Sequence, residues 1–181
     1  EAVGLCGSGV LDALAALHRV GAVDPRGRIA EAHPVVVRHQ DKRAAQIAPG
    51  VLFTQHDVRA VQLAKAAIRT AVDLLLDEAG LDPGQLERFI IAGAFGAYID
   101  IESGIAIGLF PDLPRERYEQ VGNAAGVGVR MLLSSGGARA RAAELAARSR
   151  YIELSSRGDF QKRFLHNIGF PRPSTLSRTT P

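Results

Sequence analysis

The spacing of apolar side chains predicts one long helix in the second quarter of the chain. Positions three or four residues apart form a single face, as on an α-helix, at 58, 61, 65, 68, 72, 75 and 79. The preceding run Thr54–Asp57 has the polar ends of a helix-capping box, and Gly80 follows as a stop signal. We therefore expect a helix that begins after Thr54 and ends at Ala79.

Lys65 interrupts the apolar face of this predicted helix. In one interpretation its stem packs against the core while its ammonium group reaches water. In the other, the helix passes beside a polar ligand that Lys65 faces, with Gln62 or Arg69 one turn away. The sequence leaves both interpretations open.

Two apolar runs in the second half of the chain each lead into a glycine turn. Leu86–Ala92 and Tyr118–Val121 predict short strands that are covered on both faces. The first strand is followed by the turn Gly93–Gly96, and the second by Gly122–Gly128, which opens a helix through Leu133. Because strand, glycine turn and helix are repeated, the chain is expected to have an α/β fold.

Shorter runs predict the remaining elements. Helices are expected over Val10–Val20, within Tyr98–Phe110, and over Ala138–Arg148 and Asp159–Ile168; strands are expected at Val35–Val37, within Gln46–Phe53 and at Tyr151–Leu154. The segment Arg38–Arg43 is expected to be a charged connector between the first two strands. The proline, serine and threonine residues after Phe170 predict a disordered tail, so we expect the domain at residues 1–171 and the tail at 172–181.

The two glycine turns are candidate ligand contacts, although neither matches a standard phosphate motif. The sequence IIAGAFGA is not G-x-G-x-x-G, and no G-K-(S/T) follows it. A glycine before a helix lets a ligand approach backbone N–H groups, but it can also do no more than let the helix pack close to a sheet. Two such turns at the carboxyl ends of neighbouring strands favour the ligand interpretation, because open α/β sheets bind ligands there.

The segment Gly4–Gly9, with the sequence GLCGSG, has three interpretations. It can form an anion cradle, place a reactive thiol before a helix, or act as a turn and helix cap. No second cysteine or neighbouring histidine accompanies Cys6, so a structural Cys6 is favoured, with Gly7, Ser8 and Gly9 as polar contacts. One cysteine cannot form an internal disulfide or hold a cluster alone, and the five histidines lack metal-binding spacing, so no metal site is expected.

Composition and charge argue against several classes of protein. Hydrophobic residues make up 46% of the 181 residues, which is typical of a globular protein. The longest uncharged apolar stretch, Phe89–Ile99, is too short to cross a bilayer, so no membrane contact and a cytoplasmic location are expected. The net charge is +3, and few aromatic residues accompany the basic residues late in the chain. An acidic protein partner or a solvated face is therefore expected rather than nucleic acid.

Carboxylate motifs for phosphoryl transfer are missing from the sequence. Such chemistry needs a carboxylate that places Mg²⁺ or the attacking water, and no D-x-G-x-(T/N) element occurs. We therefore expect no catalytic residue in this chain. The chain begins with Glu1 and enters a glycine motif almost at once, and it is expected to be a fragment of a longer protein.

Five segments together resemble one family: GLCGSGVLDAL, TQHDVRAVQLAKAAIRTAVDLLL, FIIAGAFGAYIDIESGIAIGLFPDLP, VGNAAGVGVRMLL and YIELSSRGDFQKRF. They are similar to the C-terminal domain of the reductive activators of corrinoid proteins, which are iron–sulfur ATPases of the actin, sugar-kinase and heat-shock-chaperone superfamily. The resemblance covers residues 3–171. It implies an actin-like ATPase lobe of the ribonuclease-H-like kind, with a central mixed sheet flanked by helices.

The resemblance also implies which residues contact a nucleotide. The adenosine turn of the superfamily matches Gly93, Ala94, Phe95 and Gly96. The helix that connects the two lobes matches Gly122, Asn123, Ala124, Ala125 and Gly126. The helix that offers polar side chains to adenine and ribose matches the one that carries Gln62, Lys65 and Arg69. Ala94 departs from the pattern, since related ATPases often have a second glycine there, and this implies a less close approach of the backbone to the nucleotide.

The resemblance implies that the intact protein uses ATP and Mg²⁺ and carries a 2Fe-2S cluster in a domain outside this chain. The implied activity is transfer of an electron to cob(II)alamin on a corrinoid protein or corrinoid methyltransferase, which restores cob(I)alamin. The intact protein is expected to be a homodimer. Two alternatives stay open: a dimerisation or docking module with a degenerate nucleotide site, and a small-molecule kinase lobe of the same superfamily.

Overall fold

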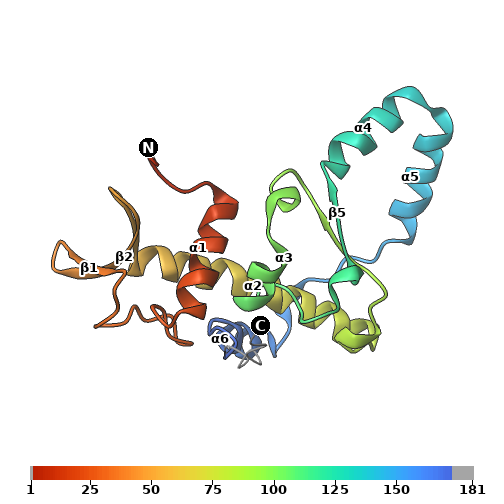
Figure 1. Cartoon of the computed structure of the whole chain (residues 1–181). Coiled ribbons are helices and arrows are strands. Elements are labelled where there is room, and N and C mark those ends of the chain that lie inside the picture. Colours follow the sequence, from red (N-terminus) through yellow and green to blue (C-terminus); the bar gives the residue numbers. More distant parts are fainter. Residues whose placement is uncertain (1, 173–181) are drawn as a thin grey trace, which may run out of the picture.

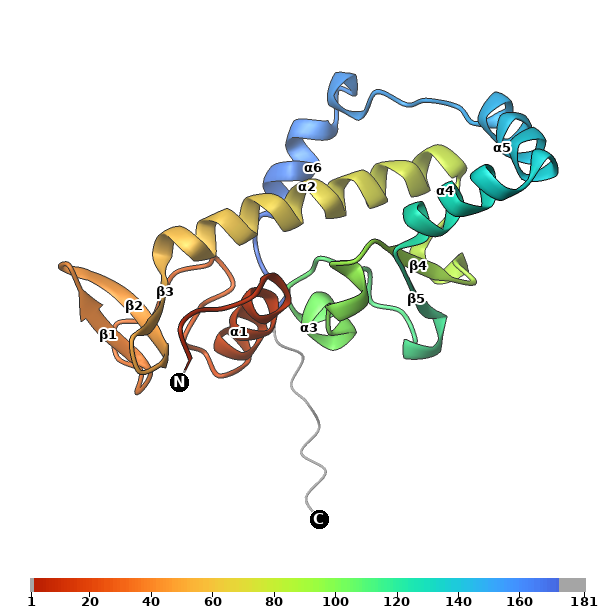
Figure 2. The same ribbon diagram turned by 90° about the horizontal axis from the view of Figure 1, so that it is seen from above.

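One long helix, α2 (Gln55–Ala79), organises the fold in the computed structural model, which describes residues 2–172. Figures 1 and 2 show a three-stranded sheet at one end of α2, and a two-stranded sheet and a helical hairpin at the other. Helices α1 (Gly7–Arg19) and α3 (Ile101–Ala106) pack against each other on one side of α2, and α6 (Phe160–Asn167) lies on another. The predicted tail lies outside the described residues, apart from Arg172.

The predicted capping box begins α2. The Thr54 backbone N–H donates to Asp57 Oδ2 at 2.8 Å, and the Asp57 backbone N–H donates to Thr54 Oγ1 at 3.3 Å. Gly80 ends the helix in the left-handed conformation, with φ of 66°. The prediction of this helix and of both its ends is confirmed.

Replacing Thr54 by alanine is expected to lower the free energy of unfolding by about 1 kcal/mol, because an orphan N–H at the start of α2 loses its acceptor. Urea unfolding followed by circular dichroism measures this loss. Thr54→Ser keeps a hydroxyl oxygen at the same place and serves as the control. An equal loss in both variants would show that the methyl group of Thr54, and not the cap, is what stabilises the protein.

The buried face of α2 differs from the predicted apolar face. Its buried residues are Val58, Gln62, Lys65, Ala66, Thr70, Leu74 and Leu76. Ile68 and Leu75, which were predicted to be on the buried face, are 49% and 47% exposed. Of the two interpretations of Lys65, the one in which its ammonium group reaches water is wrong, since this residue is 3% exposed. Polar side chains can be buried here because backbone carbonyl groups of later residues accept their hydrogen bonds.

The first sheet is antiparallel, in the order β1 (Val36–His39), β2 (Lys42–Ala48) and β3 (Val51–Thr54). Strands were predicted in this region, but the connector predicted at Arg38–Arg43 is wrong. Most of that segment is strand, and only Gln40 and Asp41 form the turn, with positive φ of 46° and 59°.

The second sheet pairs β4 (Phe89–Ala92) with β5 (Tyr118–Gly122) in parallel. Both strands were predicted, and the α/β class is confirmed. Burial on both faces is wrong, because Ile91 is the one buried residue of β4 and Ile90 is 52% exposed. Within residues 2–172 the strands also form two separate sheets and not the single central mixed sheet that was expected.

The remaining helices follow the predicted order with shifted ends. They are α4 (Ala124–Ser134) and α5 (Gly136–Arg148). Short 3₁₀ turns, which were not predicted, lie at Pro83–Gln85, Gly96–Tyr98, Arg115–Arg117 and Leu154–Ser156. Within the predicted Tyr98–Phe110 only α3 is α-helical, and Gly108 with φ of 73° follows its end. The strand predicted at Tyr151–Leu154 is wrong: Tyr151 is 82% exposed and pairs with no strand.

The main core lies between α1, α3, the first sheet and the β4–β5 pair. Fully buried side chains there include Leu14, Ile29, Phe53, Ile101 and Ile107. The described part of the chain contains no helix with the length and hydropathy needed to cross a membrane.

Candidate functional site

Three glycine-containing segments meet at the carboxyl ends of β4 and β5. The Gly93 backbone N–H donates to the Gly122 carbonyl oxygen at 2.7 Å, which joins the two turns that follow the strands. At the start of α1, a Cβ atom on Gly7 would lie 2.6 Å from Phe95 Cε2, so the Phe95 ring rests directly on this glycine. The structure thus brings together residues of the three predicted contact segments, which lie far apart in the sequence.

The backbone of the two turns is open to approach. Gly93 and Gly122 have positive φ of 107° and 62°, and a Cβ atom on either would meet nothing within 4 Å. Among the described residues, the N–H groups of Ala94 and Phe95 have no hydrogen-bond acceptor, and both residues are exposed, whereas Gly96 is buried against Ile91. A ligand with anionic or carbonyl oxygen atoms can therefore reach unpaired backbone donors at this edge of the sheet.

Side chains beneath the turns hold them in place. Gln120 Nε2 donates to the carbonyl oxygens of Gly96 and Ile99 at 2.7 and 2.9 Å. Asn123 Oδ1 accepts from the Gly126 N–H at 2.9 Å and so caps α4. Gln120 was not predicted from the sequence, although an amide side chain within a predicted buried strand was a signal that could have identified it.

The start of α1 is capped by Cys6, as the favoured interpretation of this cysteine expected. Its Sγ accepts from the Gly9 N–H at 3.4 Å and lies 3.5 Å from Ser8 Oγ. The hydrogen bond with Ser8, and then that from Gly9, lowers the pKa of the Cys6 thiol. One turn later, Asp12 Oδ1 is buried and has no hydrogen-bond partner in the part of the chain that the structure describes. Asp12 was not predicted as a site residue.

The three predicted polar residues of α2 make their hydrogen bonds with other segments. Gln62 Nε2 donates to the Ile168 carbonyl oxygen at 2.9 Å, and Arg69 Nη1 donates to that of Phe110 at 3.2 Å. Lys65 Nζ donates to the Gly169 carbonyl oxygen and lies 5.3 Å from the centre of the Phe170 ring. Burial, and then the charge of Arg69, lowers the pKa of Lys65 to about 8. Gln62 and Lys65 therefore fasten the segment after α6 to α2, and Arg69 fastens the segment after α3.

The described residues suit a nucleotide better than a metal cluster. The open glycine backbone and the free N–H groups fit the oxygen atoms of a nucleotide. No group of three histidine, cysteine, aspartate or glutamate side chains that could hold a metal ion is found between residues 2 and 172. With one cysteine, the chain does not offer the ligands of a 2Fe-2S cluster.

Comparison with known proteins identifies the family. The C-terminal domain of RACo, described as the ASKHA domain, matches residues 1–179. The corrinoid activation enzyme RamQ of Eubacterium limosum is 35% identical over 184 residues, which cover 92% of this chain and 31% of RamQ. The reductase of the Co(II) methylated amine-specific corrinoid protein from Methanosarcina barkeri is 30% identical over 123 residues, which cover 68% of this chain and 21% of the reductase.

A solved structure agrees with these relatives. The reductive activator for corrinoid, iron-sulfur protein superposes with a TM-score of 0.82 at 32% identity, covering 93% of this chain and 28% of that one. The chain therefore spans less than a third of the length of the proteins it matches. The predicted actin-like fold is confirmed, and the chain belongs to the family of RACo C-terminal domains, which have the ASKHA fold.

Proposed function

We propose that this chain is the nucleotide-binding lobe of an ATP-dependent reductive activator that restores cob(I)alamin on a corrinoid protein or corrinoid methyltransferase. The observation that carries the nucleotide assignment is the meeting of three glycine segments with an open backbone at the ends of β4 and β5. The corrinoid assignment is supported by the names of the relatives, which are corrinoid activation and corrinoid protein reductase enzymes.

In this proposal the chain binds and orients the nucleotide with its backbone. The N–H groups of Ala94 and Phe95 donate to it, while Gly93 and Gly122 leave room for its approach. Gly96, also a predicted contact, is buried in this structure, so its contact with a nucleotide requires that the turn moves. A bound nucleotide supplies free energy for conformational change, and it shifts an equilibrium only by its different affinities for the two states. The carboxylates that hold Mg²⁺ and the attacking water belong to a lobe outside this chain.

Gln62, Lys65 and Arg69 stay predicted contacts of the adenosine. Their present acceptors are the carbonyl groups of Ile168, Gly169 and Phe110. Contact with a nucleotide therefore requires that these side chains break their hydrogen bonds to the three carbonyl groups and form new ones to the nucleotide. The same holds for the predicted contacts by Ser8, Gly9, Asn123 and Gly126, whose groups now cap α1 and α4.

The proposal places the other cofactor and the partner outside this chain. The 2Fe-2S cluster lies in a separate domain, and the corrinoid partner accepts the electron in the cytoplasm. No membrane and no nucleic acid takes part.

The nucleotide assignment predicts that Gly93→Val weakens ADP binding at least tenfold, roughly 1.4 kcal/mol, because a side chain would cover the open backbone and strain a residue with φ of 107°. Isothermal titration calorimetry tests this on the chain expressed together with the lobe that the proposal places before it. The control is Gly84→Val, since Gly84 also has open space but no positive φ. Equal affinity in both variants, or no ADP binding by the wild type, would refute the nucleotide assignment.

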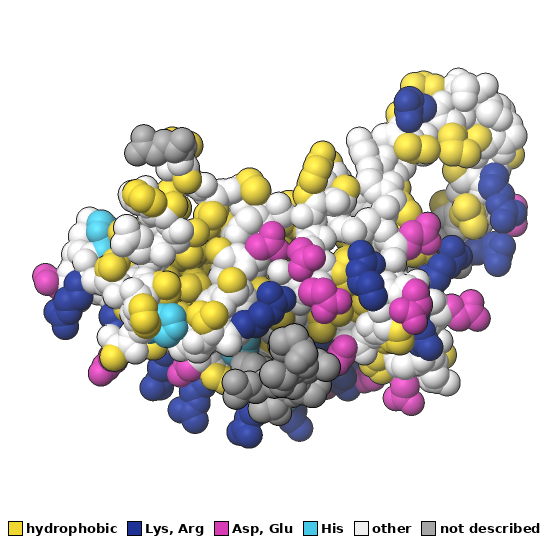
Figure 3. Space-filling view, viewed as in Figure 1, with side chains coloured by type: hydrophobic (Ala, Val, Ile, Leu, Met, Phe, Trp, Pro, Cys, Tyr) yellow, Lys and Arg dark blue, Asp and Glu magenta, His cyan; other side chains and the backbone are white. Residues whose placement is uncertain are grey.

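A docking or dimerisation role is the second candidate, and the α4–α5 hairpin favours it. Neither helix has a buried residue, and its exposed apolar side chains include Val129, Met131, Leu133 and Leu145. Figure 3 shows hydrophobic side chains at the surface of this hairpin, which stands away from the rest of the molecule. Light scattering coupled to size exclusion tests whether the protein is a dimer that Leu133→Glu dissociates.

A further inference from the structure

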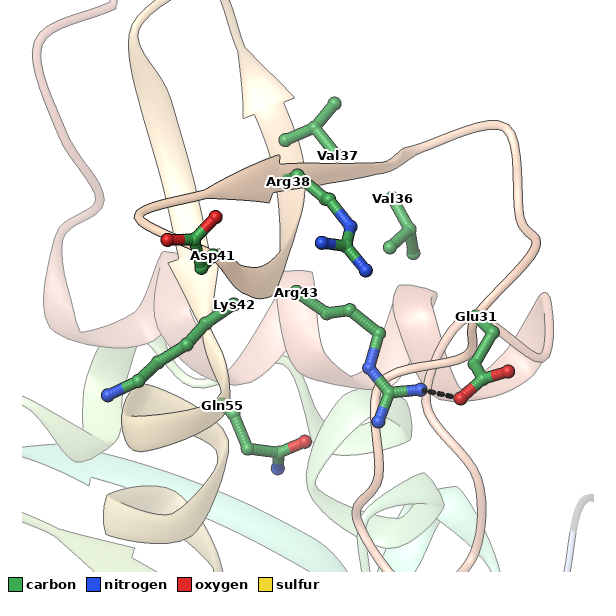
Figure 4. Close-up of a pocket in the computed structure, with 8 residues that line it drawn as sticks. All are labelled: Glu31, Val36, Val37, Arg38, Asp41, Lys42, Arg43 and Gln55. Atoms are coloured by element: carbon green, nitrogen blue, oxygen red, sulfur yellow. Dashed lines mark hydrogen bonds and ion pairs between the residues drawn. The ribbon is translucent and has the colours of Figure 1, made fainter.

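The β1–β2 hairpin forms one wall of a cleft that lies apart from the glycine turns. It is at the end of α2 opposite the β4–β5 pair (Figures 1 and 2). The cleft has a volume of about 590 Å³, and its opposite wall carries Glu31 (Figure 4). Gln55 fixes this arrangement, since its side chain accepts from the Ile29 N–H at 3.0 Å and donates to the Gly27 carbonyl oxygen at 2.6 Å.

Two arginines are directly opposite each other in this hairpin. The strand register pairs Arg38 with Arg43, so both side chains leave the same face of the sheet. Figure 4 shows the two guanidinium groups on the same side, with Glu31 approaching Arg43 from the loop. The Arg43–Glu31 ion pair spans 3.2 Å, and among the described residues Arg38 has no ion-pair partner.

No stabilising contact within the described part of the fold explains why Arg38 and Arg43 lie opposite each other. Like charges in directly opposite positions destabilise a sheet, and an exposed ion pair such as Arg43–Glu31 stabilises it little. The Glu31 side chain is 88% exposed, so the bond can be exchanged readily. The turn adds a second unfavourable feature, because Gln40 adopts a positive φ of 46°, where glycine, asparagine or aspartate is usual.

We propose that Arg38 and Arg43 together bind a carboxylate side chain on an acidic segment of a protein partner. Arginine binds carboxylates through parallel hydrogen bonds, and Arg43 already holds one such group. In the complex the partner carboxylate bridges the two guanidinium groups and displaces Glu31.

The surroundings favour a protein segment over a small free anion. The Arg43 side chain is 42% exposed at the rim of the cleft, whereas small-ligand sites enclose most of their ligand. Val36, which shares the face of β1 that carries Arg38, adds an apolar side chain beside the charges (Figure 4). β1 is also an edge strand, although its Val36 N–H already donates to the His33 carbonyl oxygen at 2.8 Å, so pairing with an extended segment is limited to the part of β1 after this N–H group.

Fluorescence anisotropy with a labelled octaglutamate peptide tests the proposal at low ionic strength. Arg38→Gln is expected to weaken binding about fivefold, and Glu31→Gln to strengthen it about twofold, because the internal competitor is removed. The control is Arg130→Gln, which removes the same charge from exposed α4 and is expected to leave binding almost unchanged. Circular dichroism confirms the fold of each variant.

Three results would overturn the proposal. Equal weakening by Arg38→Gln and Arg130→Gln would mean that the peptide is attracted by the net charge of the protein and does not bind in the cleft. Unchanged or weaker binding in Glu31→Gln would contradict the displacement of Glu31. Inorganic phosphate that binds in an Arg38-dependent way, without any binding of the peptide, would identify a free-anion site instead of a protein contact.

Discussion

Gly27→Ala is expected to destabilise the protein by about 3 kcal/mol, although Gly27 is far in sequence from the residues it supports. Gly27 has φ of +79°, and a Cβ atom on it would lie 2.4 Å from the amide atoms of Gln62. Gln62 is completely buried and donates to the carbonyl oxygens of Ile168 and Arg26 at 2.9 and 3.3 Å. Displacing the amide therefore breaks hydrogen bonds in addition to straining the backbone. Chemical denaturation measures the loss.

A second glycine separates these two effects. Gly50 has nearly the same φ, +77°, but a Cβ atom on it would meet nothing within 4 Å. Gly50→Ala is expected to lower the free energy of unfolding by about 1 kcal/mol, because it strains the backbone without displacing any side chain. Amide hydrogen exchange at Ile168 and Phe170, whose N–H groups donate to the carbonyl oxygens of Leu165 and Pro25, is expected to become faster in Gly27→Ala and to stay unchanged in Gly50→Ala. Equal losses of stability in the two variants would show that Gln62 does not fasten the segment after α6.

Local sequence signals were sufficient for the ends of α2 but not for its buried face. The capping box at Thr54 and the stop at Gly80 involve neighbouring residues, so they can be read directly. The burial of Gln62 and Lys65 depends on acceptors about a hundred positions later, at Ile168 and Gly169. Apolar periodicity contains no information about such acceptors, and it therefore placed the buried face on Ile68 and Leu75 instead.

In the candidate site, too, local features could be predicted from the sequence and tertiary contacts could not. The strands and their glycine turns at Gly93 and Gly122 were predicted because a short apolar run followed by glycine is a local pattern. The packing of Phe95 on Gly7 is a tertiary contact that no spacing predicts. The β1–β2 hairpin was missed for a different reason: Gln40–Asp41 is not a usual two-residue turn, and the charged strand residues suggested a connector.

The burial of Lys65 leads us to expect that the free energy of unfolding rises with pH in mildly alkaline solution. Its pKa is lowered from 10.5 to about 8, first by burial and then by the charge of Arg69. Between these values the unfolded chain binds more protons than the folded chain, so the free energy of unfolding increases with pH. The expected gain is about 2 kcal/mol between roughly pH 7.5 and 9.5. Tyr118, whose pKa burial raises to about 12, opposes this gain only above its ordinary value of 10.0.

Lys65→Met isolates this contribution, because methionine fills a similar volume and does not titrate. Denaturation midpoints of the wild type and the variant are compared across the same pH range, so that contributions from other titrating groups cancel. The wild type is expected to gain about 2 kcal/mol relative to Lys65→Met as the pH rises, because its buried ammonium group loses its proton. Parallel pH profiles would mean that the ammonium group is solvated in the folded protein. In that case the hydrogen bond from Lys65 to the Gly169 carbonyl would not be held in a buried environment, and the segment after α6 would be fastened by Gln62 and the packing of Phe170 instead.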